Sequence, residues 1–188
     1  MKAPEDYIPI RVLHDFVGRL ESLGIDYMLT GSMAMMRYTV FRQTADIDVI
    51  VDLQLKSLRN LIDSLEPDYY VPHGRARRAV ETRRMFNVIH QDTAFKVDCV
   101  IKKQDAFQRT SFERREKTDY YGRPAYVISK EDLILSKLNW AKESRSEMQQ
   151  RDIANLLRTG FDETYVAEWA GRLGVEDLLS KCREEATG

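Results

Sequence analysis

The hydrophobic pattern divides the chain into short elements of two kinds. Over residues 10–23, apolar side chains recur every three or four positions, as in a helix that buries one side, and Gly24 ends this pattern. Short runs rich in β-branched and aromatic residues, bounded by turn residues, predict strands. The predicted strands cover residues 26–30, 46–51, 69–71, 85–90, 94–101 and one segment of residues 120–129. The predicted helices between them cover residues 32–38, 55–65 and 105–117.

The pattern changes after residue 128. From Ser129 onward only helical periodicity remains, and it predicts about four helices with breaks near Ser144, Gly160 and Gly174. The fold expected from this order is α+β: a mixed sheet flanked by helices, followed by a helical C-terminal subdomain. We place the domains at residues 1–128 and 129–188.

The composition is that of an ordinary globular protein. Of the 188 residues, 43% are hydrophobic and 31% are charged, and 29 Lys and Arg nearly balance 30 Asp and Glu. Any surface that binds nucleic acid must therefore be a local patch. Two cysteines make no disulfide framework, and the sequence shows neither a signal peptide nor an apolar run long enough to span a membrane. We expect a cytoplasmic protein without membrane partners.

Three carboxylates interrupt apolar strands. Asp46 and Asp48 lie in TADIDVIVD, and Asp98 lies in FKVDCVI. Residues two apart on a strand project from the same face, about 6.5–7 Å apart, so Asp46 and Asp48 repel each other unless a cation lies between them. Mg²⁺ or Mn²⁺ would resolve this conflict, and a neighbouring Asp98 would complete a two-metal centre for phosphoryl-type transfer. The alternative is that the aspartates mark a strand end or a solvated edge, as Asp52 does.

A Gly-Ser pair lies where the predicted strand 26–30 meets the next helix. Gly31 allows the backbone to approach a phosphate closely, and Ser32 adds a hydroxyl beside the free N–H groups of the helix start. The alternative role of Ser32 is a simple helix N-cap.

These residues carry a family resemblance. Gly-Ser, thirteen further residues, Asp-x-Asp on the next strand and Lys-Val-Asp on a later strand resemble the nucleotidyltransferase superfamily of the DNA polymerase β type. Arg42 and Thr44, which precede Asp-x-Asp, match one branch of it. The tail EDLILSKLNWAKESRSEMQQRDIANLL is similar to the C-terminal half of AbiEii-type nucleotidyltransferase toxins and related bacterial proteins. The resemblance covers residues 24–157.

The resemblance implies a role for each matching residue. Gly31 and Ser32 would hold the β- and γ-phosphates of an NTP, Asp46 and Asp48 would bind metal, and Asp98 would complete the site and act as general base. Other candidates have two interpretations each. Lys96 either leans toward phosphate or is a solvated strand lysine, and Lys137 is either a triphosphate clamp or a surface lysine lying over Leu138. Asp152 either orients Lys137 or is a first-turn acid, and Arg42 either contacts phosphate or pairs with Asp46 or Asp48.

The function predicted from these residues is transfer of a nucleoside monophosphate from an NTP to a hydroxyl of RNA, protein or a small molecule. The resemblance adds a toxin role and an antitoxin partner. A basic run either contacts an acceptor RNA or a triphosphate, or is a solvated face; it contains Arg75, Arg77, Arg78, Arg83 and Arg84. The alternative function is a catalytically inactive module that binds a nucleotide or a partner on the same scaffold.

Overall fold

The computed structural model describes residues 7–39, 44–144 and 146–187. Its elements, in chain order, are α1 (Ile8–Ser22), β1 (Tyr27–Thr30), α2 (Gly31–Met35), β2 (Asp46–Val51), α3 (Leu55–Leu65), β3 (Tyr69–Tyr70), α4 (His73–Thr82), β4 (Met85–His90), β5 (Lys96–Ile101), α5 (Ala106–Glu113), β6 (Glu116–Tyr120), β7 (Arg123–Val127), α6 (Lys130–Ser144), α7 (Glu147–Leu157), α8 (Glu163–Leu173) and α9 (Glu176–Thr187).

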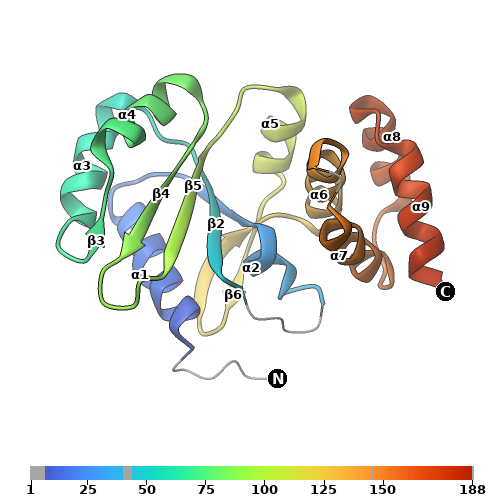
Figure 1. Cartoon of the computed structure of the whole chain (residues 1–188), viewed down its shortest axis with the longest axis horizontal. Helices are drawn as coiled ribbons and strands as arrows, with labels where there is room; N and C mark the ends of the chain where they lie inside the picture. The colour runs from blue at the N-terminus through green and yellow to red at the C-terminus, as the bar shows by residue number, and fades with distance from the viewer. Residues whose placement is uncertain (1–6, 40–43, 145, 188) are drawn as a thin grey trace.

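A mixed seven-stranded sheet forms the centre of the molecule (Figure 1). The strand order is β3-β4-β5-β2-β1-β7-β6. β2 runs parallel to β5 and antiparallel to β1, and β1 runs parallel to β7. The predicted fold class, a mixed sheet flanked by helices, is confirmed.

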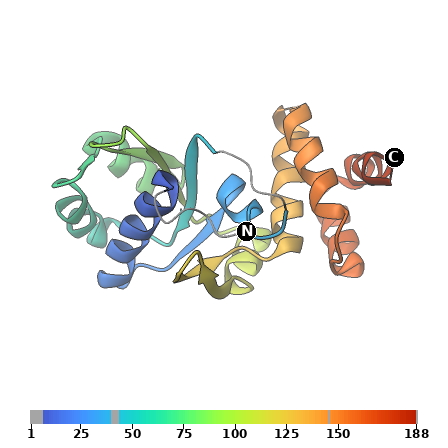
Figure 2. The ribbon, with the colours of Figure 1, turned by 90° about the horizontal axis from the view of Figure 1, so that it is seen from below.

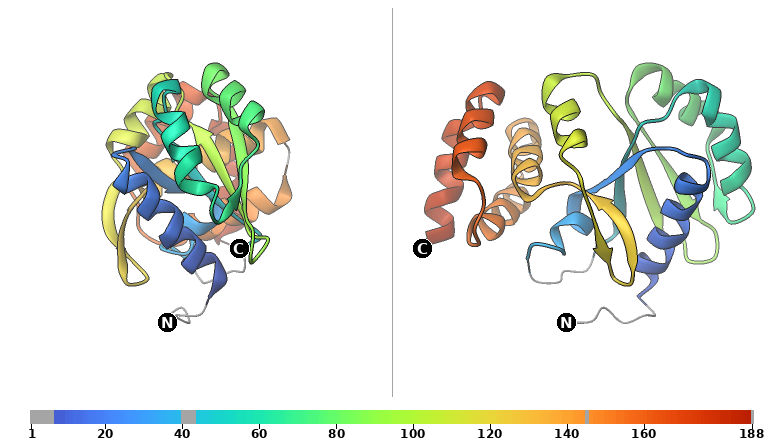
Figure 3. Two further views of the ribbon diagram at one scale, coloured as in Figure 1. Left: turned by 90° about the vertical axis from the view of Figure 1, so that its left-hand side faces the viewer. Right: turned by 180° about the vertical axis from the view of Figure 1, so that it is seen from behind.

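The main apolar core lies between the sheet and the helices that cover one of its faces. Leu13, Phe16 and Leu20 of α1 are fully buried, as are Ile47 and Val49 of β2. α1 packs beside α3, and α3 beside α4, which Figure 3 shows from two sides. Because side chains alternate along a strand, burial of the odd-numbered residues of β2 directs its even-numbered residues to the opposite face.

The C-terminal helices gather at one end of the molecule, coloured orange to red in Figures 1 and 2. α6 follows directly on β7 and contacts α2, so it reaches the part of the sheet where β1 ends. α7 packs against both α6 and α9. The division into domains at residues 128 and 129 remains a prediction. In the part of the chain that the structure describes, none of the helices has the length and apolar character needed to cross a membrane.

The predicted helix over residues 105–117 is wrong at its C-terminal end. α5 ends at Glu113, and Glu116–Tyr120 form the edge strand β6, which pairs antiparallel with β7. The two-residue turn between these strands has positive φ at both Tyr121 (54°) and Gly122 (91°), as the right-handed twist of a tight hairpin favours. The polar sequence of β6 resembles a continuing helix surface because an edge strand buries little of its length.

Candidate active site

The register of three neighbouring strands brings the predicted acidic residues together. Asp48 of β2 lies directly opposite Asp98 of β5 on one side and opposite Thr30 of β1 on the other. Asp46 lies opposite Lys96. Residues paired across neighbouring strands share a face, with Cβ atoms about 4.5–5.5 Å apart, so these side chains form one polar group on the sheet.

Lys96 supplies a positive charge within this group. Its Nζ donates a 2.9 Å hydrogen bond to Oδ2 of Asp98 and lies 3.5 Å from Oδ2 of Asp46. The neighbouring carboxylates raise the pKa of the Lys96 ammonium, chiefly through the hydrogen bond to Asp98. Whether Lys96 also contacts phosphate remains a prediction.

Asp48 is the most perturbed carboxylate of the group. Burial, followed by repulsion from Asp46 and then Asp98, raises the pKa of Asp48 to about 6, against opposing contributions from Lys137 and Lys96. A carboxylate with such a pKa is held in an environment that disfavours its negative charge. A cation bound beside Asp48 would stabilise its charged form.

The donor set fits a divalent cation. Asp98 is only 6% exposed, and its Oδ1 atom is buried without a hydrogen-bond partner. An unsatisfied buried carboxylate oxygen is costly, and Mg²⁺ or Mn²⁺ prefers such oxygen ligands. Among the described residues, however, no three Asp, Glu, His or Cys side chains already form a metal-binding group, and Lys96 provides the positive charge near Asp46 and Asp98 instead.

The close contact of Gly31 with Asp48 leaves no room for a side chain at position 31. Its φ is +61°, and a Cβ atom placed on it would lie 2.0 Å from Oδ2 of Asp48. Only glycine therefore allows the start of α2 to lie against this carboxylate. Ser32 follows Gly31 in α2 and is half-buried.

A buried ion pair holds Lys137 between two C-terminal helices. Nζ of Lys137 in α6 donates to Oδ2 of Asp152 (2.9 Å) and Oε1 of Gln149 (3.0 Å), both in α7. All three residues are buried. The charge of Lys137 partly offsets the rise in the pKa of Asp48.

Arg42 lies outside the described residues, so the structure does not place it. The neighbouring Thr44 donates a 2.7 Å hydrogen bond from Oγ1 to the backbone carbonyl of Asp46. This contact fixes the entry into β2 just before the first aspartate.

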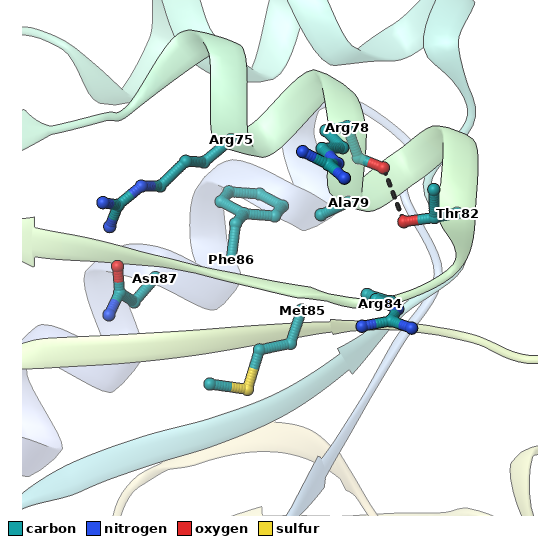
Figure 4. Close-up of a pocket in the computed structure, with 8 residues that line it drawn as sticks. All are labelled: Arg75, Arg78, Ala79, Thr82, Arg84, Met85, Phe86 and Asn87. Atoms are coloured by element: carbon teal, nitrogen blue, oxygen red, sulfur yellow. Dashed lines mark hydrogen bonds between the residues drawn. The ribbon is translucent and has the colours of Figure 1, made fainter.

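The structure separates the five arginines of the basic run. Arg77 pairs with Glu81 on the exposed side of α4, and Arg83 donates to the backbone carbonyl of Lys102. Arg75, Arg78 and Arg84, in contrast, surround a hollow of about 310 Å³ at the edge of β4, which Figure 4 shows. Its lining also includes Ala79, Thr82, Met85, Phe86 and Asn87.

Two polar residues of the site were not predicted from the sequence. Asn87 of β4 lies opposite Asp98 and so shares the face of the acidic group, and Gln149 accepts a hydrogen bond from the Lys137 ammonium. Asn within MFNVIH is as unusual in a strand as Asp is, and this was a usable signal. That Asn87 lies opposite Asp98, however, is known only from the strand register.

Comparison with known proteins agrees with the geometry. The model of the family described as nucleotidyltransferase of unknown function (DUF6036) matches residues 14–163. A search of curated protein sequences finds no significant match.

Solved structures of similar fold include three proteins of low sequence identity. A nucleotidyltransferase-like protein from Paracoccidioides brasiliensis is 16% identical with a TM-score of 0.58, and the match covers 96% of this chain and 94% of that one. The antibiotic-resistance factor ANT(2'')-Ia is 14% identical with a TM-score of 0.53, covering 95% and 92%. The lincosamide antibiotic adenylyltransferase LnuA in its lincomycin-bound form is 18% identical with a TM-score of 0.51, covering 83% and 98%.

At these identities the structural matches show the shared fold, and the superfamily resemblance of the sequence is confirmed, while its closer likeness to AbiEii-type toxins remains a prediction. Because the family model matches well over half of the chain, the protein belongs to the DUF6036 family of nucleotidyltransferases.

Proposed function

We propose that the protein transfers a nucleoside monophosphate from an NTP to a hydroxyl group, using the acidic group on β2 and β5 with a divalent cation. The observation that carries this proposal is the arrangement around Asp48. Its carboxylate faces Asp98 across the parallel strands and lies against the Cβ-free Gly31, and Asp98 retains one buried, unsatisfied oxygen. Mg²⁺ or Mn²⁺ held by Asp46, Asp48 and Asp98 would neutralise phosphate charge and polarise the reacting phosphoryl group.

Residues on two sides of the acidic group bind the phosphates of the NTP. Gly31 and Ser32, at the end of β1, bind the β- and γ-phosphates through backbone N–H groups and the Ser32 hydroxyl. Lys137 contacts the same phosphates from α6, and Asp152 and Gln149 hold its ammonium in place. A positioned cation of this kind stabilises the charge that develops on the leaving pyrophosphate.

The acceptor reacts beside Asp98. Its hydroxyl oxygen attacks the α-phosphorus, the bond between the α-phosphorus and the bridging oxygen breaks, and pyrophosphate leaves. Asp98 accepts the hydroxyl proton. Phosphoryl transfer depends mainly on such positioning and on charge stabilisation, so a few well-placed side chains suffice.

The test combines binding with transfer. Calorimetric titration of each NTP should show at least tenfold tighter binding with Mg²⁺ or Mn²⁺ than with EDTA, because phosphates otherwise meet three carboxylates. Incubation with α-labelled NTP, Mg²⁺ and a cell extract should label one fraction of the extract, and Asp98→Asn should abolish that labelling.

Equal affinity with and without the cation would contradict the metal assignment. Cation-dependent NTP binding without any labelled product would favour the inactive binding module instead. The toxin role and the antitoxin partner are further predictions of the tail resemblance, and a labelled fraction from the extract gives the first test of what such a toxin would modify.

A further inference from the structure

The order of residues across the sheet indicates where the acceptor lies, given the proposed function. On one face, Asn87, Asp98, Asp48 and Thr30 follow one another across β4, β5, β2 and β1. The phosphates lie at the β1 end, next to Gly31. Since the attacking and leaving oxygens stand in line on opposite sides of the phosphorus, the acceptor approaches from the β4 end.

At the outer edge of β4, between this strand and α4, lies the hollow lined by Arg75, Arg78 and Arg84. It extends from Phe86, on the α4 side of the sheet, to Asn87 on the face of the acidic group. In the view of Figure 4, Arg75 and Asn87 lie toward one end of the hollow and Arg84 toward the other. Among the described residues, none that lines it is acidic. Within the described chain, none of these three guanidinium groups has an ion pair or hydrogen-bond partner on another side chain. Three uncompensated positive charges in a protein of net charge −1 favour an anionic ligand.

From Asn87, exposed apolar side chains extend across β4 and β3 on the face of the acidic group. Met85 (53% exposed) and Ile89 (36%) lie on the same face of β4 as Asn87, and Tyr70 (61%) lies opposite Ile89 on β3. Among the described strands, none pairs with the outer edge of β4 from Met85 to Val88, because β3 pairs only with Ile89 and His90. The surface therefore offers rings and methyl groups beside free backbone polar groups.

We propose that the acceptor is the end of a single-stranded RNA. Arg75, Arg78 and Arg84 bind its backbone phosphates, and Tyr70 and Ile89 receive its unstacked bases, as positive charge beside an apolar or aromatic platform does in single-strand recognition. The terminal ribose hydroxyl then reaches Asp98 next to Asn87. The ribose oxygen bonds to the α-phosphorus, pyrophosphate leaves, and the hydroxyl proton passes to Asp98, so the RNA gains one nucleotide.

The same charges argue against a polycationic acceptor. An aminoglycoside carries several amines, and three arginines without acidic partners at the acceptor end of the sheet would repel it. An isolated phosphate would use the arginines but not the exposed ring of Tyr70. An RNA strand engages both parts of the surface.

The test measures RNA binding directly, without NTP. Fluorescence anisotropy of a labelled single-stranded RNA of about twelve nucleotides, within the usual site size of single-strand binders, should show binding that weakens with salt. The variant Arg75→Ala/Arg78→Ala should bind at least tenfold more weakly, with a salt slope smaller by about 0.7 for each phosphate that the protein no longer neutralises. Arg77→Ala is the matched control, since Arg77 lies on the same helix but pairs with Glu81 away from the hollow, and it should change affinity less than twofold.

A second variant separates RNA from phosphate alone. Tyr70→Ala should weaken RNA binding at least fivefold, the lower end of the cost of removing one stacking ring, with an unchanged salt slope. Circular dichroism confirms that these surface variants fold.

Equal RNA binding by the parent protein and the double arginine variant would overturn the proposal. So would RNA binding that Tyr70→Ala leaves unchanged, or the absence of RNA binding by the parent. Titration of Mg²⁺-ATP into the same proteins tests the proposed function separately, because the arginines and Tyr70 lie away from the phosphate-binding end. Retained Mg²⁺-ATP binding without RNA binding would refute the acceptor and leave the transferase in place.

Discussion

At Gly31 the backbone lies against a carboxylate of the candidate site. A methyl group there would overlap Oδ2 of Asp48 and would also occupy a backbone conformation with φ of +61°. The two penalties can be measured separately, because Gly24 has nearly the same φ (+64°) and a methyl group on it would meet no atom within 4 Å.

We expect Gly31→Ala to destabilise the protein more than Gly24→Ala. Gly24→Ala should cost about 1–2 kcal/mol for the left-handed backbone alone. Gly31→Ala should cost a further ~1–3 kcal/mol, the scale of overpacking, and should displace Asp48 and abolish cation-dependent NTP binding. Urea unfolding gives the free energies and calorimetry gives the binding. Equal destabilisation of the two variants would show that the Asp48 side chain moves aside at little cost, and that its contact with Gly31 does not fix its position.

At the scale of elements, α6 contains two buried lysines with different hydrogen-bond partners. Lys137 donates to Gln149 and Asp152 of α7, whereas Lys130 donates to the backbone carbonyls of Thr159 and Gly160 between α7 and α8. Lys137 is 5% exposed and Lys130 is 9% exposed. They therefore allow a comparison of the proposed phosphate-binding lysine, Lys137, with a structural one on the same helix.

We expect Lys137→Met and Lys130→Met both to lower stability, and only Lys137→Met to abolish triphosphate recognition. Removing one member of the buried Lys137–Asp152 pair should cost about 3–5 kcal/mol. Calorimetry at low temperature, where both variants are folded, should show Lys130→Met binding Mg²⁺-ATP like the parent. Lys137→Met should bind ATP no better than adenosine. Failure of both variants to bind would mean that the whole helix, and not the Lys137 ammonium, is what the nucleotide requires.

The sequence was informative for elements whose pattern is local. The apolar strands, their interrupting aspartates and the Gly-Ser segment could be read directly, because burial imposes alternation and a carboxylate disturbs it. β6 was missed because an edge strand needs few apolar residues. Asn87 and the separation of Arg77 from Arg75 and Arg78 depend on register and on the orientation of α4, which only tertiary packing determines.

At the scale of the whole molecule, α5 and the residue that follows it contact the C-terminal helices. The rings of Phe107 in α5 and Trp169 in α8 lie 5.5 Å apart, and Nε of Arg114 donates to Oδ2 of Asp132 at 3.2 Å. The guanidinium carbon of Arg114 also lies 4.0 Å from the centre of the Tyr165 ring in α8. We propose that the two predicted domains fold as one cooperative unit.

This proposal has a simple optical test. Both tryptophans, Trp140 and Trp169, lie in the C-terminal helices, so tryptophan fluorescence reports mainly on that part, while far-ultraviolet circular dichroism reports on the whole chain. Urea unfolding should give the same midpoint by both probes, as expected for a two-state transition. Midpoints that differ by more than about 0.3 M would show that the helices unfold separately from the sheet.

The internal position of β1 has a consequence for protein synthesis. β1 lies between β2 and β7, and β7 ends at Val127, far along the chain from Gly31. A nascent chain therefore carries its Gly-Ser segment through about half of translation before β1 gains its second neighbour, and Lys137 follows later still. We therefore expect the ability to bind NTP to arise late in synthesis, after both sets of proposed phosphate-binding residues, Gly31 with Ser32 and Lys137, have left the ribosome.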